Sequence, residues 1–271
     1  MMKLLMSFFM KKKVWLSLLA VWIWVGSSTA SWAENYRVPA SVVRQISSVL
    51  GEPMLANERL PRRDSIQVLS QGGEPFIRIS LSHGDAGGGP TDTDPRHAAI
   101  FGFRERAEVR TEAELQPNSV YRIAFEVRFV AGFEGDDSTV FQAHSSRKPP
   151  LLLYFRDFGR THLQAALMQG CLSTCGHNDQ PEYQRHKTIF PRSAMFGRWH
   201  QVQIDMDTSN RGSMTILVNG RALTRNAPTI FPSQHRTYLK LGIYRSTDTA
   251  RSETSVVDYR RLSIERLGSA N

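Results

Sequence analysis

Along most of the chain, apolar and polar residues alternate with a period of two, as they do in half-buried β-strands. In residues 119–130, every second residue from Tyr121 to Phe129 is apolar. Residues 65–69 and 75–82 alternate in the same way, and further short strand-like stretches lie at 101–112, 138–144, 151–156, 162–168, 199–206, 213–218, 237–245 and 255–265. Because many short strands separated by turns build two-layer β folds, the pattern predicts an all-β protein, a two-sheet antiparallel sandwich or jelly roll.

Turn residues divide these strands into hairpins. Asn219-Gly220 stands between two strand-like runs, and this dipeptide favours a two-residue hairpin turn. Gly72-Gly73 joins residues 65–69 to 75–82, which predicts a second hairpin there.

Three segments depart from the strand pattern. Residues 41–50 space their apolar side chains at helical intervals, which predicts a short helix. Residues 83–96 are rich in Gly, Pro and Asp and are predicted to form a loop. Residues 170–198 break the alternation and are predicted to cross one face as a long excursion. No repeat or linker is visible, so we expect residues 34–271 to form a single domain.

The N-terminus has the pattern of an export signal. Lys11, Lys12 and Lys13 precede an apolar run, Val14 to Gly26, and Ser31-Trp32-Ala33 offers small residues at a cleavage site. This combination predicts a signal peptide at residues 1–33 and a periplasmic or secreted protein without a membrane anchor after cleavage. The alternative is an uncleaved N-terminal anchor.

Composition and charge narrow the function classes. Hydrophobic residues make up 41% and charged residues 22% of the chain, which excludes a disordered protein. The net charge is +9, and +5 remains without the first 33 residues, which hold four lysines and no acid. A basic surface suits an anionic polysaccharide or a nucleic acid. Since no nucleic-acid-binding motif is present and the chain is exported, we expect no nucleic-acid partner.

Cys171 and Cys175 are the only cysteines. In an oxidising compartment two nearby cysteines are expected to pair, so we predict a Cys171–Cys175 disulfide. A metal site that includes His177 is the alternative, but a second pair of ligands is missing.

Three of the predicted strands carry polar side chains on one face, because residues i and i+2 of a strand point to the same side. These side chains are Arg106, Glu108 and Arg110 in the first strand, Gln142 and His144 in the second, and Tyr238, Lys240 and Tyr244 in the third. The opposite face of the third strand is apolar, and Gly242 leaves space between Lys240 and Tyr244.

The same three blocks resemble the R-x-E-x-R, Q-x-H and Y-x-K-x-G-x-Y motifs of β-jelly-roll polysaccharide lyases, which include alginate lyases, glucuronan lyases and heparin lyase I-like proteins. They occur here in the same order along the chain. Trp199-His200 followed by Val218-Asn219-Gly220 also resembles a stretch that these proteins share with other concanavalin A-like sandwiches. The resemblance covers roughly residues 75–265 and implies a concanavalin A-like β-jelly roll that cleaves a uronate-containing anionic polysaccharide, such as glucuronan, alginate or a glycosaminoglycan-like polymer, by β-elimination.

The residue types suit that chemistry. Gln142 and one of Arg106 or Arg110, of which we assign Arg110 to the catalytic group, would neutralise the uronate carboxylate and stabilise the enolate. His144 is the expected base and Tyr244 the expected acid, although Tyr244 could also act as the base. We expect the substrate to be bound by a further set of residues: Arg106, Glu108, Lys240, Arg245, Tyr238 and His97. Glu108 would orient its flanking arginines.

Two other functions fit the same sandwich. A non-catalytic carbohydrate-binding module would keep the basic face without needing His144 and Tyr244 together. A glycoside hydrolase would need two suitably spaced carboxylates, and the only acidic cluster near a strand, residues 134–137, reads as a loop. We expect no cofactor. Some members of the resembled families bind Ca²⁺, but no acidic cluster here has convincing ligand spacing. We expect a monomer.

Overall fold

The structure is a computed structural model, and it describes residues 36–56, 60–85, 92, 94–96, 103–131, 133, 138–145, 149–156, 162–169, 183–187, 194–231, 236–246 and 254–270. Contacts along the chain group residues Ala33–Asn271 into one compact unit, apart from Met1–Trp32. The predicted signal peptide lies outside the described residues, as do His97, Cys171, Cys175 and His177. No helix among the described residues is long and apolar enough to cross a membrane.

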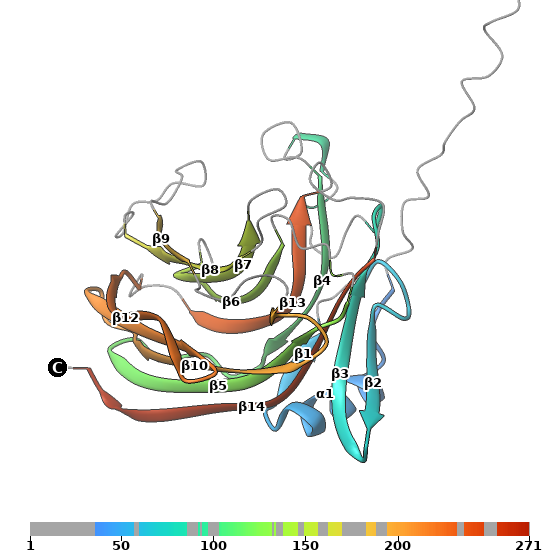
Figure 1. The fold of residues 1–271 in the computed structure, drawn as a ribbon, viewed down its shortest axis with the longest axis horizontal. Helices are drawn as coiled ribbons and strands as arrows, with labels where there is room; N and C mark the ends of the chain where they lie inside the picture. The colour runs from blue at the N-terminus through green and yellow to red at the C-terminus, as the bar shows by residue number, and fades with distance from the viewer. Residues whose placement is uncertain are drawn as a thin grey trace, which may run out of the picture. The chain divides into compact units, whose positions relative to one another are not determined.

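The described strands form two antiparallel seven-stranded sheets, as the alternating pattern predicts (Figure 1). Sheet A has the order β1 (Met54–Ala56), β4 (Arg104–Thr111), β13 (Thr237–Ser246), β6 (Thr139–Ser145), β7 (Leu151–Arg156), β8 (His162–Met168) and β9 (Tyr183–Lys187). Sheet B has the order β12 (Arg221–Thr229), β11 (Gly212–Val218), β10 (Trp199–Asp207), β5 (Ser119–Phe129), β14 (Ser255–Ser269), β3 (Glu74–Leu81) and β2 (Ile66–Gln71). The fold is therefore the expected jelly roll.

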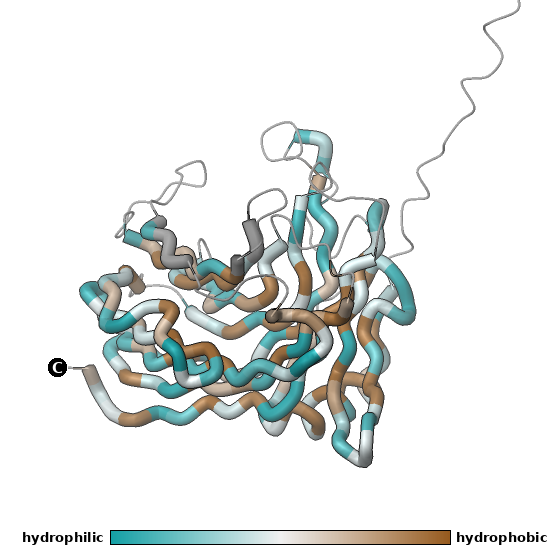
Figure 2. The backbone as a smooth tube through the Cα atoms, in the orientation of Figure 1, coloured by the Kyte–Doolittle hydropathy of each residue, from teal (hydrophilic) through white to brown (hydrophobic). Residues whose placement is uncertain are grey.

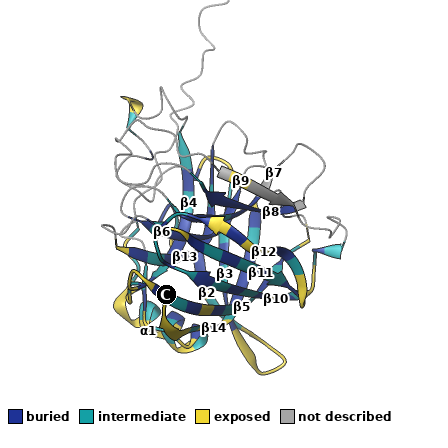
Figure 3. Cartoon of the chain, turned by 90° about the vertical axis from the view of Figure 1, so that its left-hand side faces the viewer, coloured by how far each residue is buried: buried dark blue, intermediate teal, exposed yellow. Residues whose placement is uncertain are grey.

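The core lies between the two sheets. Apolar residues alternate with polar ones along the strands (Figure 2), and the apolar set points inward. Phe125 of β5 and Phe141 of β6 meet across the interface with stacked rings, 4.9 Å between centroids. The middles of the strands are buried, whereas several connecting turns are exposed (Figure 3). Burial of one face of each sheet is the main stabilising contribution.

The Asn219-Gly220 turn forms as predicted. Both residues have positive φ, 52° and 74°, which the two-residue hairpin turn between β11 and β12 requires. The side chain of Asn219 accepts a hydrogen bond from the backbone N–H of Gln201 and contacts Nδ1 of His200 at 2.9 Å. The Trp-His and Val-Asn-Gly stretches are therefore joined by hydrogen bonds, which fix the hairpin turn against the start of β10.

The predicted helix is confirmed as α1 (Ala40–Leu50), which buries Ile46 and Leu50 and ends at Gly51 with φ of 88°. The short strand β1 follows the helix and pairs with β4. The sequence analysis did not predict β1, because three residues are too few to show an alternating pattern. The expectation of an irregular excursion over residues 170–198 is wrong for 183–187. That segment forms β9, which pairs with β8.

Candidate active site

The three strands that carry the polar blocks lie side by side in sheet A, in the order β4, β13, β6. Lys240 is the central partner of one row, with Arg110 on one side and Gln142 on the other. A second row pairs Tyr244 with Arg106, and Tyr238 pairs with His144. Antiparallel pairing thus gathers on one face the side chains that the sequence placed on three separate strands.

Glu108 is the centre of this face. Its carboxylate accepts a hydrogen bond from the amide of Gln142 and forms ion pairs with Lys240 and Arg106, each at 3.5 Å. Glu108 is 1% exposed. Burial disfavours its charge, but Lys240, Arg106 and the amide outweigh that effect and lower its pKa. Glu108 is therefore enclosed by its neighbours and has no free surface on which to bind a sugar, so the expectation that it binds substrate is wrong.

Lys240 is buried with Glu108, at 4% exposure. Burial lowers the pKa of Lys240, and the charge of Glu108 opposes this shift. We expected Lys240 to bind a substrate carboxylate at a neighbouring subsite. Its placement instead makes it the counter-ion that keeps Glu108 charged.

Arg106 links this centre to Tyr244. Its guanidinium carbon lies 4.4 Å from the centroid of the Tyr244 ring, and its terminal nitrogen is 3.0 Å from the buried carboxylate of Asp92. Arg104 lies over the same ring at 5.6 Å. The Nε atoms of Arg104 and Arg106 are buried without a hydrogen-bond partner among the described residues. This face thus holds two buried donors whose hydrogen-bonding capacity is unused among the described residues.

Tyr244 carries its proton in this setting. Burial raises the pKa of its hydroxyl, while the positive charges of Arg106 and Arg104 act in the opposite direction. Asp92 and Glu108 add to the increase. The hydroxyl is therefore a proton donor whose acidity depends on the balance of cations and carboxylates around it.

His144, Tyr238 and Arg110 form a stack at the other end of the face. The rings of His144 and Tyr238 are stacked with 5.3 Å between centroids, and Arg110 lies over Tyr238 at 5.1 Å. Burial and the nearby charge of Lys240 lower the pKa of His144 to about 3, and its Nδ1 has no hydrogen-bond partner among the described residues. The imidazole is neutral at physiological pH and can accept a proton.

Gly242 lies between the two ends of the face. Its φ is 153°, and a side chain there would meet the carbonyl oxygen of Ala107 and come within 2.6 Å of Cα of Glu108. Only glycine lets β4 approach β13 this closely. The predicted space at this position therefore serves the packing of Glu108 against β13.

The prediction that Arg245 binds substrate is wrong. Arg245 follows Tyr244 and therefore points to the opposite face, between the sheets, where it is 1% exposed. Its Nε is 2.6 Å from the carboxylate of Glu105, and further donors reach Ser255 and the carbonyl of Leu81. This buried ion pair belongs to the core.

Two residues of the face were missed by the sequence analysis. Arg104 lies two positions before Arg106 and so shares its side of β4, a signal that strict alternation could have provided. Asp92 lies in the segment predicted to be a loop, and nothing in its neighbourhood indicates that it reaches Arg106. Among the described residues, no group of His, Cys, Asp or Glu is placed to hold a metal ion.

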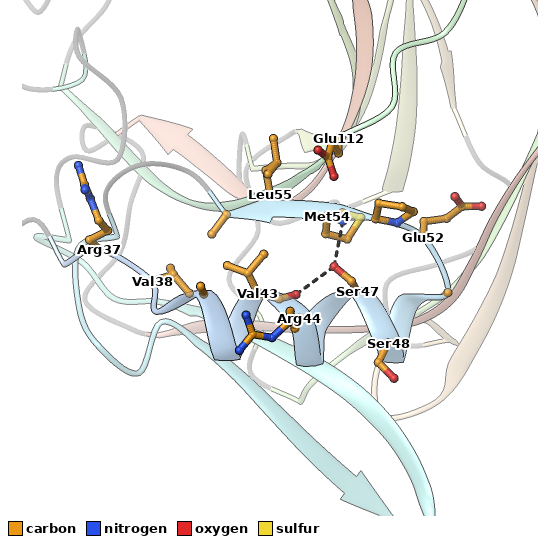
Figure 4. A pocket seen from close by; sticks show the side chains of 14 residues that line it. Arg37, Val38, Val43, Arg44, Ser47, Ser48, Glu52, Met54, Leu55 and Glu112 are labelled. Atoms are coloured by element: carbon orange, nitrogen blue, oxygen red, sulfur yellow. Dashed lines mark hydrogen bonds between the residues drawn. The ribbon is translucent and has the colours of Figure 1, made fainter.

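A separate pocket of about 980 Å³ lies between α1 and β1 (Figure 4). Ser47 of α1 closes one side by accepting a hydrogen bond from the backbone N–H of Met54. Two acidic side chains line the pocket, and one of them, Glu52, accepts a hydrogen bond from the backbone N–H of Ile264. None of the polar face's residues lines this pocket. The candidate site therefore lies on β4, β13 and β6 of sheet A and not in this pocket.

Comparisons with known proteins give the family and agree with the fold. The model of the family named polysaccharide lyase matches residues 57–258. The chain is similar in structure to an alginate lyase from Pseudomonas aeruginosa, with 15% identity over 76% of this chain and 87% of that one and a TM-score of 0.52. It is also similar to an endo-β-1,4-glucuronan lyase from the fungus Trichoderma reesei, with 15% identity, the same coverage and a TM-score of 0.50. Comparison with curated proteins gives no match. The two structures share the fold, and the family model spans most of the chain, so the chain belongs to the polysaccharide lyase family and is a polysaccharide lyase enzyme.

Proposed function

We propose that the enzyme cleaves a uronate-containing anionic polysaccharide by β-elimination on the polar face of sheet A. One observation carries this proposal: a neutral His144 and a protonated Tyr244 lie on the same face of sheet A. The same face also carries arginines that form no ion pair among the described residues. Arg104 and Arg110 stack on Tyr244 and Tyr238 and form no ion pair within the described part of the chain. Such cations attract a carboxylate in a setting of low dielectric.

The first requirement of the reaction is to make the C5 proton of the uronate acidic. Arg110 and Gln142 flank Lys240 in the same row of the sheet, and both can donate hydrogen bonds to the uronate carboxylate. Gln142 is oriented by Glu108, which accepts from its amide. As the C5–H bond breaks, negative charge moves onto the carboxylate, so donors held in advance stabilise the transition state more than the ground state.

Proton transfer then falls to His144 and Tyr244. His144 takes the proton from C5 with its neutral imidazole, and the uronate carboxylate beside it offsets the charge that it gains. The bond between C4 and the glycosidic oxygen breaks as a double bond forms between C4 and C5. Tyr244 gives its hydroxyl proton to the leaving oxygen, and Arg106 and Arg104 stabilise the phenolate that remains.

A hydrolytic mechanism on this face has less support. A glycoside hydrolase uses two carboxyl groups that reach the scissile bond. Glu108 and Asp92 are at most 1% exposed, and both are paired with Arg106. The carboxylates of Glu108 and Asp92 therefore form ion pairs with cationic side chains and are not exposed to a bound sugar.

The remaining expectations complete the proposal. We propose that residues 1–33 direct export and that the mature protein acts in the periplasm or outside the cell as a monomer. The Cys171–Cys175 disulfide remains a prediction. Free-thiol titration of the unfolded, unreduced protein tests it, since two reactive thiols would refute the bond.

The test of function is a screen of the purified protein on alginate, glucuronan and heparin, read by the ultraviolet absorbance of the unsaturated uronate product. We expect absorbance to rise with at least one polymer and not with a neutral glucan. Tyr244→Phe and His144→Gln should each reduce kcat by roughly 10²–10⁴-fold, the range of general acid–base catalysis.

Tyr121→Phe is the matched control for Tyr244→Phe. Tyr121 lies in sheet B, is 6% exposed and accepts one hydrogen bond from the N–H of Gln116. Its substitution should leave kcat unchanged. Wild-type protein that binds all three polymers without forming product, or a Tyr244→Phe variant with full turnover, would contradict the proposed reaction.

A further inference from the structure

A break in the β-ladder lies beneath the polar face. Lys240 and Leu241 of β13 pair with Gln142 and Phe141, but the next partners are Tyr244 and Thr139. Two residues of β13, Gly242 and Ile243, thus stand opposite one residue of β6, Val140. This is the arrangement of a β-bulge, which redirects the side chains on either side of it.

The bulge sets which side chains share the polar face. On β6, Phe141 points into the core, whereas Thr139 pairs directly with Tyr244 and so lies on its side of the sheet. Without the extra residue on β13, Tyr244 would no longer pair with Thr139, and its position relative to Gln142 on β6 would change by one residue. The relative placement of the proposed acid and the carboxylate-binding amide therefore depends on this irregularity.

Irregular backbone must find other hydrogen-bond partners when it is buried. Val140 has no partner in the register of β6 with β13 or with β7. Its carbonyl oxygen accepts a hydrogen bond from the hydroxyl of Tyr259, and the carbonyl oxygen of Gly242 is 3.1 Å from the same hydroxyl. One side chain thus joins both strands at the bulge.

Tyr259 belongs to the opposite sheet. It lies in β14, is fully buried and packs against Phe125 with 6.3 Å between ring centroids. The preceding residue, Asp258, is also fully buried on the outer side of sheet B, where Arg78 and Arg128 bind its carboxylate at 2.8 and 2.7 Å. The Tyr259 ring is therefore held on a strand that is fixed from both sides.

We propose that Tyr259 is a positioning residue for the active site: its hydroxyl holds the bulge at Gly242 and Val140 and so fixes Tyr244 relative to Gln142. The proposal rests on the proposed function, because it assigns Tyr244 to the reaction. Within the described part of the chain, the hydroxyl of Tyr259 hydrogen-bonds only to main-chain carbonyl oxygens between the sheets and not to the side chains of the polar face. It acts through the geometry of β13, where a small displacement of a reacting group reduces the rate strongly.

The test compares Tyr259→Phe with Tyr121→Phe. Each variant removes one buried hydroxyl that contacts the main chain, but Tyr121 contacts Gln116, in the connection between β4 and β5. We expect Tyr259→Phe to lower kcat roughly 10- to 100-fold with KM within about threefold, and Tyr121→Phe to leave both unchanged. Hydrogen exchange should become faster in residues 237–246 and 139–145 of Tyr259→Phe only.

Each result decides the proposal. Equal kcat values for the two variants overturn it, and so does a Tyr259→Phe protein that does not fold, because the hydroxyl would then serve folding alone. If the wild type cleaves no uronate polymer, the proposed function fails. Hydrogen exchange then decides alone: faster exchange confined to β13 and β6 supports the hold of Tyr259 on the bulge, and unchanged exchange overturns it.

Discussion

Arg106 lies with its guanidinium carbon 4.4 Å from the centre of the Tyr244 ring, while Asp92 holds the far end of the same guanidinium at 3.0 Å. The cation nearest to the proposed acid is therefore shared with a buried carboxylate. This sharing reduces the field that Arg106 exerts on the phenol and fixes its orientation. Asp92 is thus expected to control both the placement of Arg106 and the acidity of Tyr244.

Replacing Asp92 by Asn should move the activity of the enzyme to lower pH. Asp92 contributes to the raised pKa of Tyr244, so its neutralisation lowers that pKa. The alkaline limb of kcat/KM should therefore shift to lower pH, and kcat should fall roughly 10-fold as Arg106 reorients. Asp94→Asn is the control, because Asp94 pairs with the exposed Arg96. Identical pH profiles for both variants would refute this role.

The sequence predicts this site well where the chemistry follows strand alternation. Arg106, Glu108, Gln142 and Tyr244 lie on one face because period-two spacing fixes their side of each strand, and their three strands are neighbours as expected. Alternation also contradicts one expectation, since Arg245 directly follows Tyr244 and must point the other way.

Other features depend on tertiary contacts that no local pattern encodes. Asp92 reaches Arg106 across a loop, and β9 forms because β8 offers an edge with which it can pair. The bulge at Gly242 shows in the sequence only as a glycine, and Tyr259 reads as one more core residue of β14. Burial of Lys240 against Glu108 likewise follows from register between strands and not from spacing along one strand.

The ion pair of Arg245 and Glu105 should matter for stability and not for substrate binding. Both side chains are at most 1% exposed, so Arg245→Met leaves a buried carboxylate without its cation, at a cost of about 3–5 kcal/mol in the free energy of unfolding. Arg122→Ala, which breaks the exposed pair with Asp205, should change the free energy of unfolding far less, because solvent screens that pair. Urea unfolding measures both values. A raised KM with unchanged stability in Arg245→Met would restore the substrate role.

The neutral state of His144 should make the protein sensitive to acid. An unfolded histidine binds its proton below about pH 6.5, whereas burial and Lys240 lower the pKa of His144 in the folded protein to about 3. The unfolded state therefore binds more protons between these values, and stability is lost as the pH falls from 6.5 towards 3. His144→Gln removes this titration.

The measurement is urea unfolding of both proteins at pH 7 and pH 5. Over that interval the wild type should lose up to about 2 kcal/mol more than His144→Gln. In the free wild-type enzyme, kcat/KM should also show no inflection near pH 6.5, because His144 does not titrate there. Equal losses in the two proteins, or an inflection near 6.5 that His144→Gln abolishes, would contradict the lowered pKa.

Gly242→Ala should reduce both stability and turnover, because the added methyl group would clash with the main chain of β4. It would meet the carbonyl oxygen of Ala107 and lie 2.6 Å from Cα of Glu108, at a φ of 153° that suits glycine. Strand β4 would have to move, and Glu108 with it, so the free energy of unfolding should fall by at least about 2–3 kcal/mol and kcat by at least roughly 10-fold.

Gly73→Ala is the matched control. Gly73 has φ of 83° in the turn between β2 and β3 and no atom within 4 Å of the added methyl, so it should lose only about 1 kcal/mol and keep full kcat. If Gly242→Ala loses no more stability than Gly73→Ala and keeps its turnover, the close approach of β4 to β13 does not organise the site.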